Sequence, residues 1–500
     1  MKKFFVIILC YLLAGGLWVL SCNGDENKPE TDQCETDPQP GCPNYVEPDP
    51  CETDPQPDCP NYIDPCETDP QPGCPNYVEP DPCETDPQPD CPNYIDPCET
   101  NPQPDCPGYV DPETPILGSS ITIGAQNYTL DKKEIEKVDD GIWYMRVQLT
   151  NQSKPLIIHT VRYSTSNTGY SIETWIGRDS ISGKETPSTM VERYEQNGRQ
   201  VRVAINGGFY GTAVGGTPIT MELMNGVMTF PPVGNYPMIA FDDENRPYLD
   251  SVKMISKVVK DADKSECIIN SINGTRWTDE LVLYNSYKGK RTGTNEWGIE
   301  ALCYPTAANW ERLNSHVNVR CRVEKISTAG NMEIPKGYIV LSGHGTANQY
   351  ISTLKTGDYV NVTVDYALKS FPKISTANIR NVVSGWNIIL NENEIMDYFN
   401  NADGLESLNH PRTGVGYSAD EAYVYFTVVE GRNPTQANPT ISAGVSTKEL
   451  AQVMQYFGAA HAINLDGGGS TCLVIDKETM NFCSDGSQRA VADGLAIIKR

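Results

Sequence analysis

The stretch Ala462-Ile-Asn-Leu-Asp-Gly-Gly-Gly-Ser-Thr-Cys472 places the strongest local constraint on how this chain folds. Three successive glycines pack no side chain and cost backbone entropy, so they are expected where the backbone turns sharply or another group approaches closely. The flanking apolar residues predict two strands, Ala462 to Leu465 and Cys472 to Ile475. Asp466 would then stand at a strand end, beside backbone amides suited to an anion. A plain glycine-rich hairpin turn is the alternative.

The residues before this stretch predict a helix. Ser446 and Glu449 have the spacing of a capping box, and Gly458 is placed to end the helix. Four apolar residues between them would share one face: Leu450, Val453, Met454 and Phe457. A helix that leads straight into a buried strand is typical of α/β layers, in which site residues collect at the carboxyl ends of strands.

Two further glycine junctions follow predicted strands. Val201 to Ile205 leads into Asn206-Gly-Gly-Phe-Tyr-Gly211, for which an ordinary loop is the alternative. Arg412 stands before a predicted hairpin whose second strand is Ala422 to Val429, and Arg432 follows that strand. Arginines at strand ends are well placed to hold a phosphate or carboxylate through two hydrogen bonds, although single surface arginines are usually only solvated.

The N-terminus carries export features. Two lysines precede an apolar run from Phe4 to Leu20, which predicts a secretory signal. Val19-Leu-Ser-Cys22 resembles a bacterial lipobox, so we expect residues 1–21 to be a lipoprotein signal peptide and residues 22–33 a tether lipidated at Cys22. The protein would then be exported and lipid-anchored to a bacterial outer membrane or cell surface. A plain signal peptide or a single membrane anchor is the alternative.

Residues 34–112 consist of five tandem repeats, which begin at Cys34, Cys51, Cys66, Cys83 and Cys98. Each repeat holds a Cys-x7-Cys pair and four or five prolines, with too few apolar residues to form a core. We therefore predict a disordered or extended, semi-rigid stalk. Disulfides within each repeat would suit an exported chain. Calcium binding by the acidic residues is disfavoured, because their spacing matches no binding loop.

The acidity of the chain is local. Residues 23–112 account for −22 of the formal net charge of −26. The remainder has an ordinary charge balance, so a basic nucleic-acid-binding face is not supported.

The composition becomes globular after the repeats, and we expect one domain over residues 113–500 with a β-rich insert over residues 265–370. Five short strands are predicted in or beside that insert: Leu281–Tyr284, Gly298–Tyr304, Val317–Ile326, Tyr338–Leu341 and Tyr359–Val364. The fold class expected is α+β, with mixed sheets and a few packed helices. Trp277, Trp297 and Trp310 belong to this region, where packing in a core is favoured over stacking on sugars.

Five cysteines lie in the globular part. Cys303 with Cys321, and Cys472 with Cys483, are candidate disulfides, which leaves Cys267 unpaired. No Cys/His spacing indicates zinc, so no metal site or cofactor is predicted. A divalent cation and the oligomeric state are left open.

Several of these segments together resemble a known family. In order they are Ile205-Asn-Gly-Gly-Phe209, His410-Pro-Arg-Thr-Gly-Val-Gly416, Gly431-Arg432, Glu449-Leu-Ala451 and Asn464-Leu-Asp-Gly-Gly-Gly-Ser-Thr471. This set is similar to the phosphodiester glycosidase domain, the family of the lysosomal uncovering enzyme and of many bacterial secreted proteins. The resemblance spans residues 120–500, more loosely in the insert.

The resemblance implies hydrolysis of a sugar-1-phosphodiester at the anomeric carbon, releasing a free sugar and a phosphomonoester. It implies Asp466, Arg412 and Arg432 as the catalytic residues. The substrate-binding residues it implies, together with the adjacent His410, are Asn206, Gly207, Gly208, Thr413, Asn464, Gly467, Gly468, Gly469, Ser470 and Thr471. The substrate expected is an extracellular glycan or glycosyl phosphate.

The chemistry of such a substrate suits these residues. A departing phosphate is already a weak base, so the leaving oxygen needs less protonation than in an ordinary glycoside, where two carboxylates are the rule. The arginines and glycine amides would hold the phosphate. Asp466 would act as the nucleophile or as the base for water, and the sequence does not choose between them.

Two other functions compete with this reading. A glycosidase acting on uncharged exopolysaccharide would need a second carboxylate near Asp466, which the motifs do not supply. A non-catalytic, glycan-binding surface lipoprotein would bind through the insert tryptophans. A peptidase or esterase is disfavoured, because the chain lacks a Gly-x-Ser-x-Gly elbow with a histidine partner.

Overall fold

The computed structural model describes residues 110–500 apart from 152–153, 212–214, 307–316, 397–406 and 433–440, together with scattered residues between 40 and 106. The chain divides into two compact units, Met1–Tyr109 and Val110–Arg500. The predicted signal peptide, the tether and Cys22 lie outside the described residues.

The first unit carries the repeats. Its described part includes one short helix, α3 (Pro65–Thr68), and a disulfide between Cys66 and Cys74. For that repeat, the disulfide confirms pairing inside the repeat. Cys42, Cys59, Cys91 and Cys106 are also disulfide-bonded.

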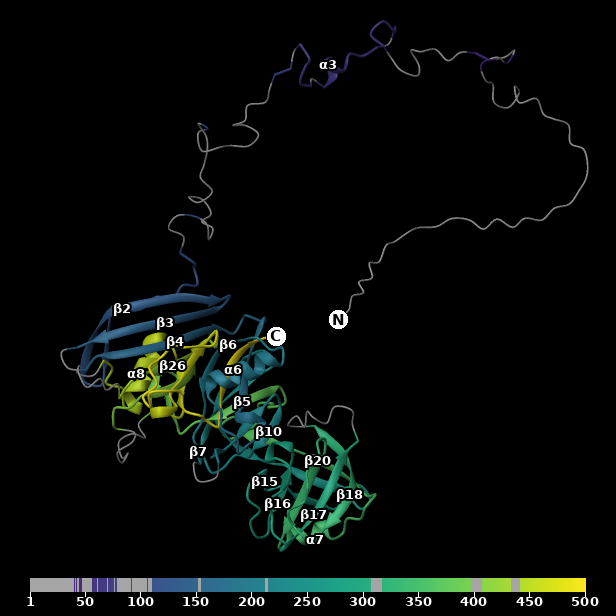
Figure 1. The fold of residues 1–500 in the computed structure, drawn as a ribbon, viewed down its shortest axis with the longest axis vertical. Helices are drawn as coiled ribbons and strands as arrows, with labels where there is room; N and C mark the ends of the chain where they lie inside the picture. Colours follow the sequence, from purple (N-terminus) through teal and green to yellow (C-terminus); the bar gives the residue numbers. More distant parts are fainter. Residues whose placement is uncertain are drawn as a thin grey trace, which may run out of the picture. The chain divides into compact units, whose positions relative to one another are not determined.

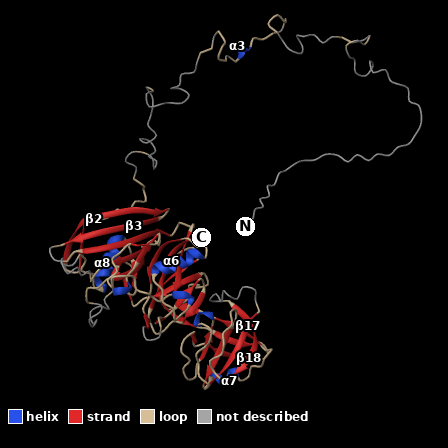
Figure 2. Cartoon of the chain, in the orientation of Figure 1, coloured by secondary structure: helices blue, strands red, loops and turns tan. Residues whose placement is uncertain are grey.

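The second unit is built mainly from strands, as Figure 2 shows in red. Two of its sheets are central. The nine-stranded sheet has the order β1 (Ser120–Ile123), β2 (Gln126–Asp139), β3 (Ile142–Thr150), β4 (Leu156–Ser164), β26 (Tyr423–Val429), β25 (Arg412–Tyr417), β27 (His461–Asn464), β23 (Asn387–Asn391) and β24 (Glu394–Ile395). The five-stranded sheet has the order β29 (Glu478–Thr479), β28 (Leu473–Ile475), β6 (Val201–Asn206), β30 (Asp493–Lys499) and β5 (Tyr170–Ile176).

These two sheets face each other across the main core. Alternate residues of each strand point into it, as the period of two in a strand requires, for example Val424 and Phe426 from β26 and Leu495 and Ile497 from β30. The opposite faces are covered by helices. Helix α8 (Thr447–Phe457) packs on the nine-stranded sheet and α6 (Pro187–Gln196) on the five-stranded one (Figure 1).

Two more sheets share a second core. The six-stranded sheet has the order β10 (Val227–Phe230), β9 (Glu222–Met224), β22 (Ile379–Ser384), β11 (Pro237–Asp242), β12 (Pro247–Met254) and β21 (Tyr366–Leu368). The eight-stranded sheet has the order β14 (Glu266–Ile268), β13 (Lys257–Lys260), β20 (Tyr359–Thr363), β18 (Asn318–Ser327), β17 (Gly298–Pro305), β19 (Ile339–His344), β16 (Leu281–Tyr284) and β15 (Ser271–Ile272). The short helix α7 (Ala347–Ile351) contacts β19 and β17, and a small hairpin joins β7 (Tyr210–Gly211) to β8 (Thr217–Pro218).

Several local predictions are confirmed. Helix α8 has the predicted capping box at Ser446 and Glu449, and it ends at Gly458 in the left-handed region with φ +104°. Its predicted apolar face is buried. The five strands predicted in the β-rich region are β16 to β20, with small shifts at their ends.

The predicted balance between helices and strands is wrong. The second unit is predominantly β rather than balanced α+β, although the few packed helices that were predicted are present. The helix-then-strand pattern before Asp466 does not belong to a parallel α/β layer, because β27 pairs antiparallel with both β25 and β23. None of the described helices combines the length and apolar character needed to cross a membrane.

The predictions for tryptophans and cysteines also need correction. Trp277 and Trp297 are 66% and 67% exposed, so they are not core residues, and Trp310 lies outside the described residues. All four candidate disulfide cysteines are free thiols.

The two candidate disulfide pairs differ in geometry. Cys303 lies opposite Val323 and Cys321 opposite Pro305, a diagonal offset of two positions that separates Cα atoms by about 7–8 Å, beyond ordinary disulfide reach. Cys472 and Cys483 are neighbouring free thiols, and each shifts the pKa of the other.

Candidate active site

The buried side chain of Asn206 joins three of the motif segments. Its Nδ2 donates to the carbonyl oxygen of Asp466 at 2.8 Å. Its Oδ1 accepts from Thr413 Oγ1 at 2.9 Å and from the amide of Cys472 at 3.1 Å. The amide of Asp466 also donates to Gly207 O at 3.0 Å. The ends of β6, β25 and β27 therefore meet at one point, and Asn206 and Thr413 hold them there.

The glycine loop forms a tight turn, with a short 3-10 segment over Gly468–Ser470. The Gly467 amide donates to Asp466 Oδ1 at 2.9 Å, and the Gly468 amide donates to Pro411 O at 2.8 Å. These two amides, predicted to hold a phosphate, are therefore engaged inside the protein. Side chains around the loop are therefore the remaining candidates for binding an anion.

Arg432 and His410 form one such group. Arg432 adopts φ +49°, a left-handed conformation that costs energy for a residue with a side chain and is often found at functional sites. Its Nε and Nη2 lie 3.1 Å and 2.9 Å from His410 Nδ1. A Cβ placed at residue 468 would lie 3.0 Å from Arg432 Nη1, so the guanidinium covers the glycine loop.

His410 is held neutral by this arrangement. Burial lowers its pKa, and the charges of Arg432 and Arg412 lower it further. Because Arg432 donates to Nδ1, the hydrogen-bond network places the single ring proton on Nε2. Nε2 is buried and has no partner among the described residues. It is therefore an unsatisfied hydrogen-bond donor, within the described part of the chain, at the edge of the site.

Arg412, which the resemblance implies as a catalytic residue, is largely buried. It is only 7% exposed, and its Nε and Nη2 donate to the carbonyls of Val445 and Leu408, both at 3.1 Å. Its charge nevertheless reaches Asp466 and lowers the pKa of that carboxyl. Asn464, at the end of β27, is buried and its Oδ1 has no partner within the described part of the chain.

Asp466 has a carboxyl neighbour that sequence reasoning missed. Asp493, the first residue of β30, is 3% exposed and accepts from the Gly208 amide at 2.6 Å. Burial raises the pKa of Asp493 to about 7, the Gly208 hydrogen bond opposes this, and the charge of Asp466 adds to it. A Cβ at residue 207 would clash with the Asp493 carboxylate, which explains the glycine there.

The carboxyl of Asp466 itself is half-buried. Burial raises its pKa, while hydrogen bonds from Ser470 and Gly467 and the charges of Arg489 and Arg412 lower it. Behind Asp493, the buried Glu222 accepts from Thr229 at 3.0 Å, and its burial together with the charge of Asp493 raises its pKa. No cluster of three or more His, Cys, Asp or Glu in the described ranges is arranged to hold a metal ion.

Arg489 is a second residue that the sequence analysis missed. Its Nη1 lies 3.4 Å from Ser470 Oγ, and its Nε donates to Asp485 at 2.8 Å. It adds a third arginine to Arg412 and Arg432 around the loop that follows Asp466. Ser470 and Thr471 are themselves buried, and Thr471 Oγ1 lies 3.4 Å from Thr413 Oγ1.

An aromatic group borders the site on another side. Trp386 donates through its amide to the carbonyl of Asn464 at 3.0 Å and is 37% exposed. Its ring lies 5.2 Å from that of Phe209 and 5.3 Å from that of Tyr236. The indole is thus fixed between two rings beside the Asp466 motif.

The sequence contains only weak signals for Trp386 and Asp493. Gly385-Trp386 precedes a strand, and Asp493-Gly494 opens one, in the same way that glycines mark the other motifs. Neither pair is distinctive alone. Sequence reasoning looked for tryptophans in the insert instead.

Comparison with known proteins agrees with the motifs. The family model described as phosphodiester glycosidase matches residues 314–498, a range that contains the Arg412, Arg432 and Asp466 motifs but not the Asn206 motif. The SPbeta prophage-derived uncharacterized protein YomE of Bacillus subtilis is 33% identical over 91 residues, which are 18% of this chain and 13% of that protein. The matched segment thus covers only a small part of this relative.

Solved structures share the fold at low identity. A hypothetical protein from Synechocystis aligns with a TM-score of 0.58 and 16% identity over 74% of this chain and 64% of that one. A protein from Burkholderia pseudomallei aligns with a TM-score of 0.60 and 15% identity over 77% of this chain and 99% of that one. The zebrafish N-acetylglucosamine-1-phosphodiester alpha-N-acetylglucosaminidase catalytic domain aligns over 74% of this chain and 83% of that one with a TM-score of 0.37 and 12% identity, too distant to support an argument. The motifs thus gather at one site, and residues 314–498, which hold three of them, match the phosphodiester glycosidase family model.

Proposed function

We propose that the protein hydrolyses a sugar-1-phosphodiester at the anomeric carbon, releasing a free sugar and a phosphomonoester. The observation that carries this proposal is the convergence of one half-buried carboxyl, Asp466, with Arg432, neutral His410 and Arg489 around a glycine loop. The family match supports the reaction class.

In the proposed reaction, the cationic, anionic and aromatic side chains have different roles. Arg432 and the Nε2 proton of His410 bind the phosphate oxygens, and they stabilise the negative charge that grows as the phosphate departs. Asp466 acts at the anomeric carbon, either by attacking it or by taking a proton from the attacking water. The exposed indole of Trp386 provides a flat apolar surface for the sugar ring. Asn206, Thr413 and Thr471, being buried, position these groups.

The test is to incubate the full chain with a panel of sugar-1-phosphodiesters and to measure both free reducing sugar and phosphomonoester. The anomeric form of the first product, followed by NMR, separates the two roles of Asp466, since a nucleophile retains configuration and a base for water inverts it. Release of neither product from any member of a broad panel would contradict the proposal.

Asp466→Asn provides the matching control. It keeps the size and most hydrogen bonds of the side chain while removing its negative charge. We expect kcat to fall at least about 100-fold with an unchanged melting temperature. Turnover close to that of the original chain would remove Asp466 from the chemistry.

A second candidate is a glycosidase acting on uncharged glycans. The observation that favours it is Asp493, a second carboxyl that senses the charge of Asp466 and keeps its proton up to a pH of about 7. An ordinary glycoside needs such an acid. Its burial and its bond to Gly208 argue for a positioning role instead. Turnover of nitrophenyl glycosides, abolished in Asp493→Asn, would favour this candidate.

We further propose that the protein works outside the cell, anchored through a lipid on Cys22, on extracellular glycans or glycoconjugates. The apolar N-terminal run and the repeats support this. Metabolic labelling with a fatty-acid analogue, lost in Cys22→Ser, tests the anchor.

A further inference from the structure

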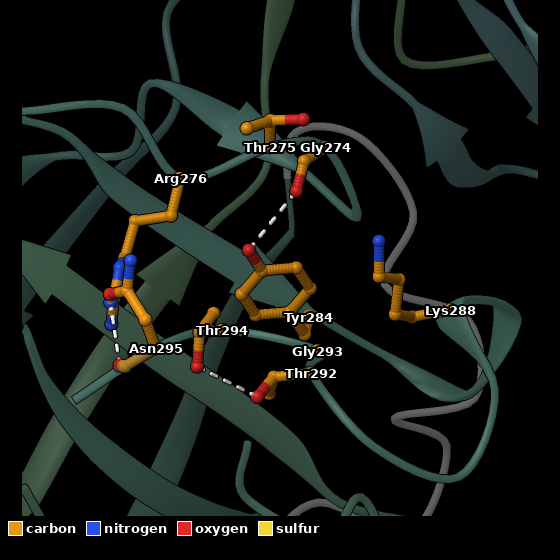
Figure 3. Close-up of a pocket in the computed structure, with 9 residues that line it drawn as sticks. All are labelled: Gly274, Thr275, Arg276, Tyr284, Lys288, Thr292, Gly293, Thr294 and Asn295. Atoms are coloured by element: carbon orange, nitrogen blue, oxygen red, sulfur yellow. Dashed lines mark hydrogen bonds between the residues drawn. The ribbon is translucent and has the colours of Figure 1, made fainter. Parts of the chain in front are cut away.

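A cavity of about 280 Å³ lies in the β-rich insert, formed by loops that no family motif includes (Figure 3). Nine residues line it: Gly274, Thr275, Arg276, Tyr284, Lys288, Thr292, Gly293, Thr294 and Asn295. A second cavity of about 240 Å³ shares Gly274, Thr275 and Lys288 with it. The lining is polar, and its only charged side chains are cations.

Neither cation is neutralised by a neighbouring carboxylate among the described residues. Lys288 Nζ donates to the carbonyl of Asn273 at 3.2 Å and stands 5.6 Å from the centre of the Tyr284 ring. Arg276 donates to Ser342 Oγ at 2.9 Å and to Asn295 O and Oδ1 at 2.9 Å and 2.6 Å. Burial lowers the pKa of Lys288, as expected for a charge desolvated without a counter-ion.

The cavity walls are held in place before any ligand arrives. The Arg276–Asn295 bonds join the two loops, and the Tyr284 hydroxyl donates to Gly274 O at 3.0 Å. Figure 3 shows Arg276 and Lys288 on either side of the Tyr284 ring. The buried carboxylate of Glu300 accepts from Thr294 and from Ser342 Oγ, and Ser342 Oγ in turn accepts from Arg276, so the serine hydroxyl stands between the two charges.

Each of the two loops continues into an exposed tryptophan. Trp277 follows Arg276 and is 66% exposed, and Trp297 lies two residues after Asn295 and is 67% exposed. Both indoles are thus accessible to a ligand bound beside the loops. Their faces suit the apolar face of a sugar ring, and the cavity volume is near the lower end of the range for small-molecule sites, roughly 300–1,000 Å³.

We propose that this insert cavity is a second binding site, separate from the Asp466 site, for a saccharide unit that carries a phosphate or carboxylate group. Lys288 and Arg276 bind the anionic group, and Trp277 or Trp297 stacks on the sugar. The proposal concerns binding alone and does not depend on hydrolysis at Asp466.

The test is calorimetric titration of the full chain with glucose 6-phosphate, glucuronate, neutral glucose and inorganic phosphate, at low and at physiological salt. We expect the two anionic sugars to bind, glucose not to bind, and affinity to fall as salt rises. Lys288→Met, which keeps the stem over Tyr284, should weaken binding by about tenfold or more. Lys290→Met, an exposed lysine outside the lining, should leave it unchanged.

Further variants separate this site from the catalytic one. Trp277→Ala combined with Trp297→Ala should weaken binding of the sugars but not of inorganic phosphate. Arg432→Ala should leave the Lys288-dependent binding in place, because it removes only phosphate binding at the Asp466 site. Equal binding in Lys288→Met and the original chain, loss only in Arg432→Ala, or no binding of either anionic sugar would each overturn the proposal. Inorganic phosphate binding as tightly as the sugar phosphate would overturn its saccharide part.

Discussion

Trp386 connects two of the motif segments at the candidate site. Its amide is bonded to Asn464, two residues before Asp466, and its ring is held by Phe209 from the Asn206 motif. A rotation of the indole would therefore disturb contacts to both motifs. Under the proposed function, a fixed indole face suits the sugar ring rather than the phosphate.

Removing this ring should affect binding more than chemistry. Trp386→Ala should raise KM for a sugar-1-phosphodiester roughly 3- to 10-fold with a small change in kcat, because the stacking surface is lost while the charged groups remain. Trp386→Phe should recover part of the loss. Steady-state kinetics measures both constants, and Phe371→Ala, at a 53% exposed residue outside both proposed sites, serves as the exposed-aromatic control. A fall in kcat alone would argue against a stacking role.

Asp493 makes the stability of the domain depend on pH. Its folded pKa of about 7 lies above the value of about 3.9 for an unfolded aspartate, so the folded state holds a proton that the unfolded state has lost. Stability from this group therefore falls as pH rises from about 4 to about 7.

Asp493→Asn should remove that dependence. The amide can still accept from Gly208, and it carries no charge to bury. Relative to the original chain, we expect a gain of up to about 4 kcal/mol at pH 8 and little difference at pH 4. Thermal denaturation between these limits measures the effect. A difference that does not change with pH would show that Asp493 is not protonated in the fold.

At the scale of elements, helix α8 supports the strands that carry the site. It packs against β25 and β27, whose ends hold Arg412, Thr413 and Asn464. Its N-terminus is fixed by a reciprocal pair of bonds, in which Ser446 Oγ accepts from the Glu449 amide at 3.2 Å and Glu449 accepts from the Ser446 amide at 2.8 Å.

Ser446→Ala should therefore destabilise the domain by about 1 kcal/mol, because one of the unpaired amides at the helix start loses its acceptor. Ser446→Asp keeps an acceptor and should stay close to the original. Chemical denaturation monitored by circular dichroism compares the three. Identical midpoints for Ser446→Ala and the original chain would show that the box contributes nothing.

A buried hydrogen-bond network also holds the start of the loop that carries Arg432. Glu430, just before it, is 5% exposed and accepts from His159 Nε2 and from the Phe482 amide, both at 2.9 Å. Tyr144 in turn contacts His159 Nδ1 at 2.7 Å. This network links β3, β4 and the end of β26, and so fixes the point from which Arg432 departs in its left-handed conformation.

At the scale of the whole molecule, the chain divides into two compact units, one with the repeats and one with the candidate site. Removing residues 66–97 deletes two complete repeats. Because the second unit holds its own cores, we expect no change in its melting temperature or in turnover of a soluble substrate. Calorimetry and kinetics of the shortened chain test this. A loss of stability would show that the stalk contributes to the folded unit, contrary to its composition.

The local sequence determined much of this protein. The glycine-marked strand ends, the capped α8 and the short strands of the insert all follow from periodicity and turn chemistry, which act over a few residues. The order of the motifs, together with their resemblance to a family, identified Asp466, Arg432 and His410 as site candidates. The proline-rich repeats likewise exclude a core by composition alone.

Only the tertiary structure decided which residues surround these site candidates. Asn206 and Asp466 are 260 positions apart yet share a hydrogen bond, and Asp493 and Arg489 reach the site from the last segment of the chain. It also showed that two glycine amides are already engaged and that Trp277 and Trp297 are exposed. These outcomes depend on how two sheets face each other, and packing between distant strands leaves no periodic trace in the sequence.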